Sequence, residues 1–384
     1  MSLRILLVSH YALPHVGGIE TAIAGIAGEL ARRGHEVTHL ASASLRPGEA
    51  ADEERAYRVV RVPAANVLER RLGVPYPLFS PRLVPALRAE VARADVVHAH
   101  GFLYQSSATA LALARRAPGR PLRVLTEHVA HVPYTSLVLD RVERVAVATI
   151  GRAVARHAEA IATYNDRVAA ELQALAPGTM AVRIANGVDV ERFRPASDPE
   201  RARLRVELGW DERPRVLLVG RGVEKKGLRV ALEAVTLADG AFELVLAGPG
   251  LAAPPGALTV EALGTLPPRR LAEVYRAADA FMLPSVGEGF PLSAQEAMAS
   301  GLPVVLGDDP AYASVVGGAG GGARLVPPAP EALVAELVAL LADPDQRARA
   351  GAEAAGHARA AFSWPAAADV HERLYAEVAE RRRR

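Results

Sequence analysis

Two adjacent lysines are the first residues in this chain that suggest chemistry. The chain has 45 lysines and arginines together, and Lys225 and Lys226 are its only lysines. They follow an apolar run at 216–219 and a glycine turn that contains Arg221. A lysine is a compact cation, and backbone amides after a strand that ends in glycines can approach an anion closely. This order predicts a phosphate site; the alternative is chance clustering of the two lysines in a solvated loop.

Two glutamates form a second candidate site further along the chain. Glu288 follows an apolar run at 280–283, and Glu296 lies inside a helix that is predicted to begin near Pro291. The helix entry comprises Gly289, Phe290, Pro291 and Leu292, whose free amides and helix dipole favour a phosphate. A carboxylate beside a phosphate would be repelled, so each glutamate must face a neutral group such as a sugar hydroxyl. Glu296 is expected to bind a ribose and Glu288 the transferred group; the alternative is two unrelated surface charges.

A glycine pair lies near the start of the chain. Gly17 and Gly18 follow the first apolar run and precede a stretch with helical spacing. The spacing G-x-G-x-x-G of the dinucleotide fingerprint does not occur here. A glycine pair before a helix lets backbone amides approach a ligand, although a plain turn would have the same sequence.

The elements that must position these residues are short apolar runs joined by helical stretches. In the first half, strands are expected at 5–9, 36–41, 58–62, 96–98, 123–127, 160–163 and 182–185. In the second half they are expected at 216–219, 242–247, 258–261, 280–283, 303–306 and 324–326. Strands without polar alternation, joined by helices, indicate parallel sheets that are covered on both faces. The sequence therefore predicts an α/β protein with two doubly wound Rossmann-like domains and a cleft between them.

The domain boundaries follow from this repetition. The first domain is expected at 1–186 and the second at 187–362. A last helix, within 363–384, is expected to return to the first domain. At 384 residues the chain exceeds what one hydrophobic core commonly serves.

The composition excludes several classes of function. A formal net charge of +2 gives no support for nucleic-acid binding, and the absence of cysteine excludes disulfides, thiolate metal sites and thiol nucleophiles. No apolar run reaches the roughly 20 residues that span a bilayer. The apolar stretch at 5–8 is too short for a signal peptide, so a cytoplasmic protein is expected.

Taken together, the motifs resemble those of the retaining, nucleotide-sugar-dependent glycosyltransferases of family four, which have the GT-B fold. The resemblance covers essentially the whole chain. It is carried by Gly17-Gly18, Gly34-His35-Glu36-Val37, Asp95-Val96-Val97-His98-Ala99-His100, Asn186-Gly187-Val188-Asp189, Gly220-Arg221, Lys226-Gly227, Ala247-Gly248-Pro249-Gly250, Glu288 with Glu296, and Gly301-Leu302-Pro303-Val304. The Glu-x7-Glu element is the most specific of these motifs.

The resemblance implies roles for individual residues. The second domain would bind the nucleotide sugar and the first a hydroxyl-bearing acceptor. Arg221 and Lys226 would neutralise the diphosphate, Glu288 would contact the donor sugar, and Glu296 the ribose. Amides at Gly18 would meet the phosphates, and His128 would lie beside the sugar. No role is assigned to Lys225 or His131, and His98 and His100 are expected to support the site structurally.

The family implies front-side attack without a protein nucleophile, in which the departing phosphate deprotonates the acceptor. It implies no metal and no cofactor beyond the donor, which would be a UDP- or GDP-sugar. The one Asp-x-Asp, Asp343-Pro344-Asp345, lies between two late helices and is expected to cap a helix. The alternatives are an inactive sugar-nucleotide-binding partner subunit and a GT-B sugar-nucleotide epimerase.

The acceptor is not identified by these residues. The product would be a glycolipid, a cell-envelope glycan or a small glycoside. The stretch 66–75 mixes apolar and basic residues, as a peripheral contact with an anionic membrane at its inner face would require. An ordinary surface loop and helix is the favoured interpretation. The oligomeric state is left open.

Overall fold

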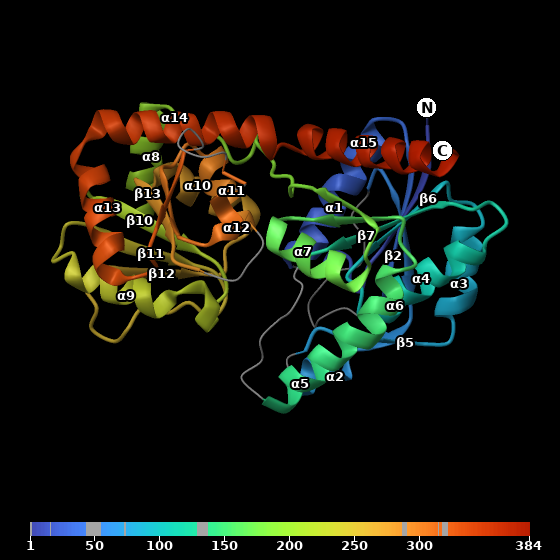
Figure 1. Cartoon of the computed structure of the whole chain (residues 1–384). Coiled ribbons are helices and arrows are strands. Elements are labelled where there is room, and N and C mark those ends of the chain that lie inside the picture. Colours follow the sequence, from blue (N-terminus) through green and yellow to red (C-terminus); the bar gives the residue numbers. More distant parts are fainter. Residues whose placement is uncertain are drawn as a thin grey trace. The chain divides into compact units, whose positions relative to one another are not determined.

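The computed structural model describes residues 2–15, 17–43, 55–72, 74–128, 137–285, 290–313, 315–316 and 322–384. The chain divides into two compact units (Figure 1). Unit 1 comprises Met1–Gly187 and Trp364–Arg384, and unit 2 comprises Val188–Ser363. The chain therefore leaves unit 1 once and returns to it with its last helix.

Unit 1 is built on a seven-stranded sheet with the strand order β3-β2-β1-β6-β7-β8-β9. Its strands are β1 (Arg4–Val8), β2 (Glu36–Ser42), β3 (Arg58–Val62), β6 (Val96–His100), β7 (Leu122–Glu127), β8 (Ala160–Thr163) and β9 (Met180–Arg183). All neighbouring pairs are parallel. The order reverses between β1 and β6, where open α/β sheets form a ligand crevice at the carboxyl ends of the strands.

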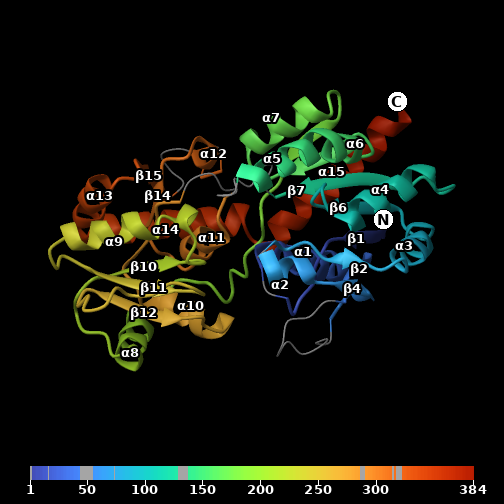
Figure 2. The same ribbon diagram turned by 90° about the horizontal axis from the view of Figure 1, so that it is seen from below.

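Successive residues of β1 point to opposite faces of this sheet, as the pleat requires. Ile5 and Leu7 pack in one core cluster with α1 (Gly18–Arg32) and α15 (Trp364–Arg383). Leu6 packs in another cluster with α3 (Leu83–Val91) and α4 (Gln105–Arg116). Figure 2 shows α1 and α15 on the opposite side of the sheet from α3 and α4. Both faces are therefore covered by helices.

The last helix belongs to the core of unit 1. Leu374, Tyr375 and Val378 of α15 are at most 3% exposed and pack in the cluster that contains α1. At the surface, Arg33 donates to Asp369 Oδ1 at 2.7 Å and to Glu372 Oε2 at 2.7 Å. Burial of the apolar side chains of α15 stabilises this contact, and the ion pairs at the surface add little to the free energy of folding.

Unit 2 is built on a six-stranded parallel sheet with the order β12-β11-β10-β13-β14-β15. Its strands are β10 (Arg215–Val219), β11 (Glu243–Ala247), β12 (Val260–Gly264), β13 (Ala280–Leu283), β14 (Val304–Gly307) and β15 (Ala323–Val326). The helices that pack in pairs around it are α8 (Asp198–Leu208) with α10 (Pro268–Ala277), α9 (Leu228–Leu237) with α13 (Pro330–Ala342), and α11 (Leu292–Ala299) with α14 (Pro344–Ala361). The strand order reverses between β10 and β13.

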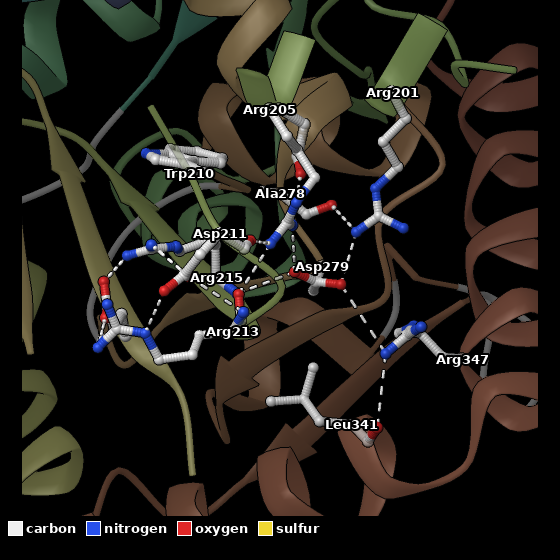
Figure 3. Close-up of polar contacts among 12 residues, drawn as sticks. Arg201, Arg205, Trp210, Asp211, Arg213, Arg215, Ala278, Asp279, Leu341 and Arg347 are labelled. Atoms are coloured by element: carbon white, nitrogen blue, oxygen red, sulfur yellow. Dashed lines mark hydrogen bonds and ion pairs between the residues drawn. The ribbon is translucent and has the colours of Figure 1, made fainter. Parts of the chain in front are cut away.

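Arginines and carboxylates gather at the amino ends of the unit 2 strands (Figure 3). Asp279, which precedes β13, accepts from Arg201 at 2.5 Å, from Arg205 at 2.9 Å and from the backbone amide of Arg215 at 2.8 Å. Arg215 also lies 5.6 Å over the ring of Trp210. These contacts tie α8 to the start of two central strands.

The predicted architecture is confirmed: both sheets are parallel, and every expected strand is present. The largest shifts are at β9, which begins two residues earlier than expected, and β12, which ends three residues later. A short antiparallel ribbon of β4 (Ala64–Ala65) and β5 (Leu78–Phe79) was not predicted from the sequence. Strands of two residues carry no periodicity to detect.

The remaining elements are short or join the strands. They are α2 (Val67–Leu72), α5 (Leu137–Ala146), α6 (Arg152–Ala155), α7 (Asp166–Leu175), α12 (Pro310–Ala313), the π-helix η1 (Val147–Gly151) and the 3-10 helix η2 (Glu224–Lys226).

Candidate active site

Two glycine loops lie side by side at the carboxyl ends of β10 and β11. The amide of Gly220 donates to the carbonyl oxygen of Ala247 at 3.1 Å, and the amide of Gly222 donates to that of Pro249 at 2.9 Å. Gly248 has φ 138°, and a Cβ placed there would lie 1.8 Å from the carbonyl oxygen of Gly220. No side chain fits at that point, so the two loops meet backbone against backbone.

The predicted cations follow the first of these loops. Arg221 is exposed, whereas Lys225 and Lys226 in η2 are half-buried. The aliphatic stem of Lys226 runs beside Gly220, since a Cβ placed on that glycine would lie 3.5 Å from Cδ and Cε. The structure therefore brings Lys226 back to the carboxyl end of β10, beside the glycine that precedes Arg221.

A second glycine joins this segment to β13. Gly227 has φ 72°, and a Cβ placed there would lie 2.7 Å from the carbonyl oxygen of Pro284. Pro284 follows β13 directly. The close approach places the start of α9 beside the carboxyl end of β13, so the loops after β10 and β13 share the point where the strand order reverses.

The helix expected near Pro291 is α11, with Pro291 at its N-cap. Phe290 is 4% exposed, and its ring centroid lies 5.7 Å from that of Tyr312 and 5.4 Å from that of Phe362. This packing fixes the entry to α11, where Leu292 begins the first turn. Glu288 and Gly289 lie outside the described residues.

Glu296 lies on α11 and is half-buried. Its Oε2 accepts a hydrogen bond from the hydroxyl of Tyr275 at 3.0 Å. Burial raises the pKa of Glu296 to about 7, against the opposite effects of the Tyr275 hydrogen bond and the positive charge of Arg192. The carboxylate thus ionises close to neutral pH and keeps one oxygen away from Tyr275.

In unit 1, the glycine pair begins α1. Gly17 is the N-cap residue, and a Cβ placed on it would lie 2.3 Å from Oε2 of Glu20. Glu20 is 3% exposed and occupies the third helical position, where a glutamate commonly turns back to the cap. Gly18 has no atom within 4 Å of its Cβ position, so this side of the first turn is open.

His128 directly follows β7 and is 8% exposed. Its Nε2 lies 3.3 Å from Nδ1 of His100, the last residue of β6. Burial lowers the pKa of His128 to about 3, so the ring is neutral at physiological pH. A neutral histidine can donate or accept a hydrogen bond, and its tautomer depends on His100. His131 lies outside the described residues.

His98 continues this cluster into the core. Its two ring nitrogens contact the hydroxyls of Tyr375 at 2.8 Å and Thr126 at 2.6 Å, and its ring stacks on His100. The C-terminal helix therefore contributes, through Tyr375, to the support beneath His100 and His128. The supporting role expected for His98 agrees with these contacts.

Sequence reasoning missed a polar cluster that follows β1. The hydroxyl of Tyr11 donates to Glu69 Oε2 at 2.8 Å, and Asn66 Nδ2 donates to the same oxygen at 2.6 Å. His15 stacks on Tyr11 with ring centroids 3.9 Å apart. The aromatic and acidic residues of this cluster come from distant segments, and a stretch at 66–75 that mixes apolar and basic residues gives no local signal for it.

Asp343 is the N-cap of α14, and its side chain accepts from the amide of Gln346 at 2.9 Å, as the capping prediction required. Within the described ranges, no group of histidines and carboxylates has the arrangement of a metal site. Across those same ranges, no helix combines the length and apolar character needed to cross a membrane.

Two family models match the chain, one in each half. The model described as Glycosyltransferase Family 4 matches residues 16–192. The model described as Glycosyl transferases group 1 matches residues 200–357.

Individual relatives cover 80% or more of the chain. The D-inositol 3-phosphate glycosyltransferase of Corynebacterium jeikeium (strain K411) is 30% identical over 98% of this chain and 97% of its own length. The GDP-mannose-dependent alpha-mannosyltransferase of Mycolicibacterium smegmatis (strain ATCC 700084 / mc(2)155) is 30% identical over 80% of each chain. The structure of sucrose-phosphate synthase from Thermosynechococcus elongatus has the same fold, with a TM-score of 0.79, 22% identity, and coverage of 98% and 99%.

Proposed function

Because the chain belongs to glycosyltransferase family 4, it is a retaining, nucleotide-sugar-dependent glycosyltransferase with the GT-B fold, and we propose that unit 2 binds the donor. The resemblance drawn from the sequence is thereby confirmed at the level of the family. The observation that carries the proposal for unit 2 is the glycine-lined end of β10, where the stem of Lys226 lies beside Gly220 and the exposed Arg221 follows that glycine.

In this proposal the donor diphosphate lies against the loop after β10. Arg221 and Lys226 face its negative charge, and the first turn of α11, from Pro291 to Leu292, supplies backbone amides and the positive end of a helix dipole. Arg221 supports this role because it is exposed and its side chain makes no hydrogen bond or ion pair within the described part of the chain.

The two glutamates take the sugar groups of the donor. Glu296 binds the ribose through its carboxylate, and Glu288 contacts the transferred sugar. The half-buried position of Glu296 beside Tyr275 supports the first role. The role of Glu288 depends on its sequence motif alone. Gly17 and Gly18 are assigned to the phosphates, and the open first turn of α1 supports that assignment for Gly18.

The transfer step needs no protein nucleophile. The bond between the anomeric carbon and the β-phosphate oxygen breaks, and the acceptor oxygen forms its bond on the same face. The acceptor proton passes to the departing phosphate oxygen. The charge that grows on the diphosphate is stabilised by Arg221 and Lys226, which already lie in place before the reaction. His128, held neutral by burial, orients the sugar by a hydrogen bond.

We propose D-inositol 3-phosphate, a small phosphorylated polyol, as the acceptor. The proposal is supported by several relatives of that name, which match over almost the whole chain. It favours the small-glycoside interpretation over a glycolipid or a cell-envelope glycan. The donor base is not decided by these relatives, because the mannosyltransferase relative is named for GDP-mannose.

A two-stage assay tests the proposal. First, a thermal-shift panel of UDP- and GDP-sugars should raise the melting temperature with one base, by an amount set by the ligand concentration over its Kd. Second, that donor is incubated with D-inositol 3-phosphate, with unphosphorylated inositol as the matched control. A phosphorylated glycoside detected by mass spectrometry would support the acceptor.

Donor binding without transfer to any acceptor would favour the inactive partner subunit, and interconversion of the donor sugar would favour the epimerase. Transfer only to a lipid-linked acceptor would overturn the inositol phosphate proposal while leaving the donor site intact.

A further inference from the structure

A buried tyrosine contacts the glutamate that is proposed to bind the ribose. Tyr275 lies on the inner face of α10, and none of its side chain is exposed. Its hydroxyl oxygen lies 3.0 Å from Glu296 Oε2 and 3.1 Å from the carbonyl oxygen of Ser293. Both of these neighbours belong to α11. The contact therefore joins two helices at the carboxylate.

The chemistry of the three groups decides where the hydroxyl proton lies. A tyrosine hydroxyl has one proton to donate, whereas the Ser293 carbonyl and the ionised Glu296 carboxylate only accept. A charged acceptor makes the stronger hydrogen bond, so the proton points to Oε2. Oε1 then remains for a ligand, since it makes no hydrogen bond within the described ranges.

The ring of Tyr275 cannot follow the carboxylate if Glu296 turns. The ring of Phe193 meets it edge-on with centroids 5.6 Å apart, and Phe281 lies 6.1 Å away at a tilted angle. Phe193 and Phe281 are themselves buried. Close-packed aromatic rings hold one rotamer, so the hydroxyl is a fixed reference point for Glu296.

The same hydroxyl favours the charged form of the carboxylate. Burial raises the pKa of Glu296 to about 7, while the Tyr275 hydrogen bond and the Arg192 guanidinium act in the opposite direction. These are the two groups that favour ionisation, one from α10 and one from the segment before α8. Loss of the hydroxyl would leave a larger protonated fraction at neutral pH.

We propose that Tyr275 is a positioning residue for ribose recognition: its hydroxyl orients Glu296 so that Oε1 accepts a hydrogen bond from a ribose hydroxyl of the donor. The inference rests on the proposed function, in which Glu296 binds the ribose. Discrimination between ribonucleotides and deoxyribonucleotides would then depend on a side chain that does not touch the ligand.

The test compares two nucleotides on two variants. Dissociation constants for UDP or GDP, whichever the wild type binds more tightly, and for its 2′,3′-dideoxy analogue are measured by calorimetry at pH 8. Tyr275→Phe should weaken binding of the ribonucleotide about tenfold and leave that of the dideoxy analogue within about twofold, because only the ribose contact is lost. Tyr375→Phe is the matched control: it removes another fully buried tyrosine hydroxyl, in unit 1, and should leave the ratio unchanged.

A second readout separates positioning from a purely structural role. Affinity for the nucleotide sugar should fall as the pH is lowered and Glu296 is protonated. This fall should begin at a higher pH in Tyr275→Phe than in the wild type. Phe193→Leu, which loosens the ring but keeps the hydroxyl, should reduce the ribose preference by about two- to threefold. This variant serves if Tyr275→Phe does not fold.

A wild-type ribose preference that survives both Tyr275→Phe and Phe193→Leu would overturn the inference and leave the proposed function standing. A wild type that binds no nucleoside diphosphate would overturn the proposed function itself. A ribose preference that survives Glu296→Gln would remove Glu296 from the ribose and the inference with it.

Discussion

The two ends of the strands in the unit 2 sheet, here called its amino edge and its carboxyl edge, differ in how their charges are paired. At the amino edge, each arginine labelled in Figure 3 contacts a carboxylate or a carbonyl group of the chain itself. At the carboxyl edge, Arg221 is exposed and follows a glycine. Both edges are strongly charged and belong to the same central strands. They differ in what surrounds the charge. Carboxylates lie among the arginines at one edge, and glycine backbone lies beside the cations at the other.

At the amino edge, the buried charge of Asp279 is paired with arginines of the chain itself. Burial alone would raise the pKa of Asp279, but Arg201, Arg205 and the amide of Arg215 outweigh it and lower that pKa below its ordinary value. The carboxylate is thus ionised and fully engaged. Such a cluster joins α8 to the starts of β10 and β13, and the Asp279 carboxylate is already occupied by partners within the chain.

The carboxyl edge has the opposite design. Gly220, Gly222 and Gly248 form a backbone surface in which the two loops pack against each other with no side chain between them. Cations beside such a surface gain most from a ligand that brings its own negative charge. The comparison separates the arginines around Asp279, whose carboxylate partner belongs to the chain, from Arg221, whose exposed side chain makes no ion pair within the described residues.

The largest expected effect is loss of stability at the amino edge. Asp279→Asn should lower the free energy of unfolding by about 3 kcal/mol, because Arg201 and Arg205 lose their shared counter-charge. Urea denaturation followed by circular dichroism measures this. Turnover by the folded fraction should stay within about twofold of wild type.

Asp211→Asn is the control for that edge. Asp211 also pairs with Arg213 and Arg215, but its side chain is 51% exposed, so the loss should be below about 1 kcal/mol. Equal losses in the two variants would contradict the view that buried charge determines the stability of this edge.

The carboxyl edge should show the reverse pattern. Lys226→Ala should lower kcat by about ten- to a thousandfold, by loss of one cation that stabilises the departing diphosphate, with little change in the urea midpoint. Steady-state kinetics of sugar transfer measures the effect. Lys225→Ala is the matched variant and tests the neighbour to which no role is assigned. Unchanged kinetics in Lys226→Ala would remove it from the mechanism.

A smaller effect is expected where the two glycine loops meet. Gly248→Ala places a methyl group 1.8 Å from the carbonyl oxygen of Gly220 at a φ of 138°, so it should cost about 1–3 kcal/mol and weaken donor binding. Gly256→Ala is the control, because Gly256 also has a positive φ, 76°, but no atom within 4 Å of its Cβ position. It should cost about 1 kcal/mol and leave donor affinity unchanged. Loss of donor affinity in both variants would attribute the effect to backbone strain alone.

The carboxyl edge was largely predictable from the sequence because its signals are local. Arg221, Lys226 and the helix entry at Pro291 lie in the segments that follow β10 and β13, and parallel strands bring their carboxyl ends together. The family resemblance then assigned roles that spacing alone left open. The roles of all these residues stay predictions, and Glu288 and Gly289 lie outside the described residues.

The supporting contacts could not be predicted in the same way. Tyr275 lies 21 residues before Glu296, on a different helix. The sequence around it indicates only an aromatic residue of the hydrophobic core. Asp279 likewise gave no signal, because its partners Arg201 and Arg205 are more than 70 residues away. Side-chain pairs that depend on how helices pack on a sheet have no sequence period.

The smallest expected effect is a pH dependence at Glu296, and it acts on affinity and stability in opposite directions. Affinity for the nucleotide sugar, whose diphosphate does not titrate near neutral pH, should rise by up to about tenfold from pH 6 to pH 8 as the carboxylate ionises. The raised pKa means that the folded state holds this proton more tightly than the unfolded chain does. The stabilising contribution is therefore complete below the ordinary glutamate pKa and is lost as the pH rises through about 7. Calorimetry and urea midpoints over this range measure the two trends, and Glu296→Gln should flatten both. Parallel changes in affinity and stability would assign the titration to another group.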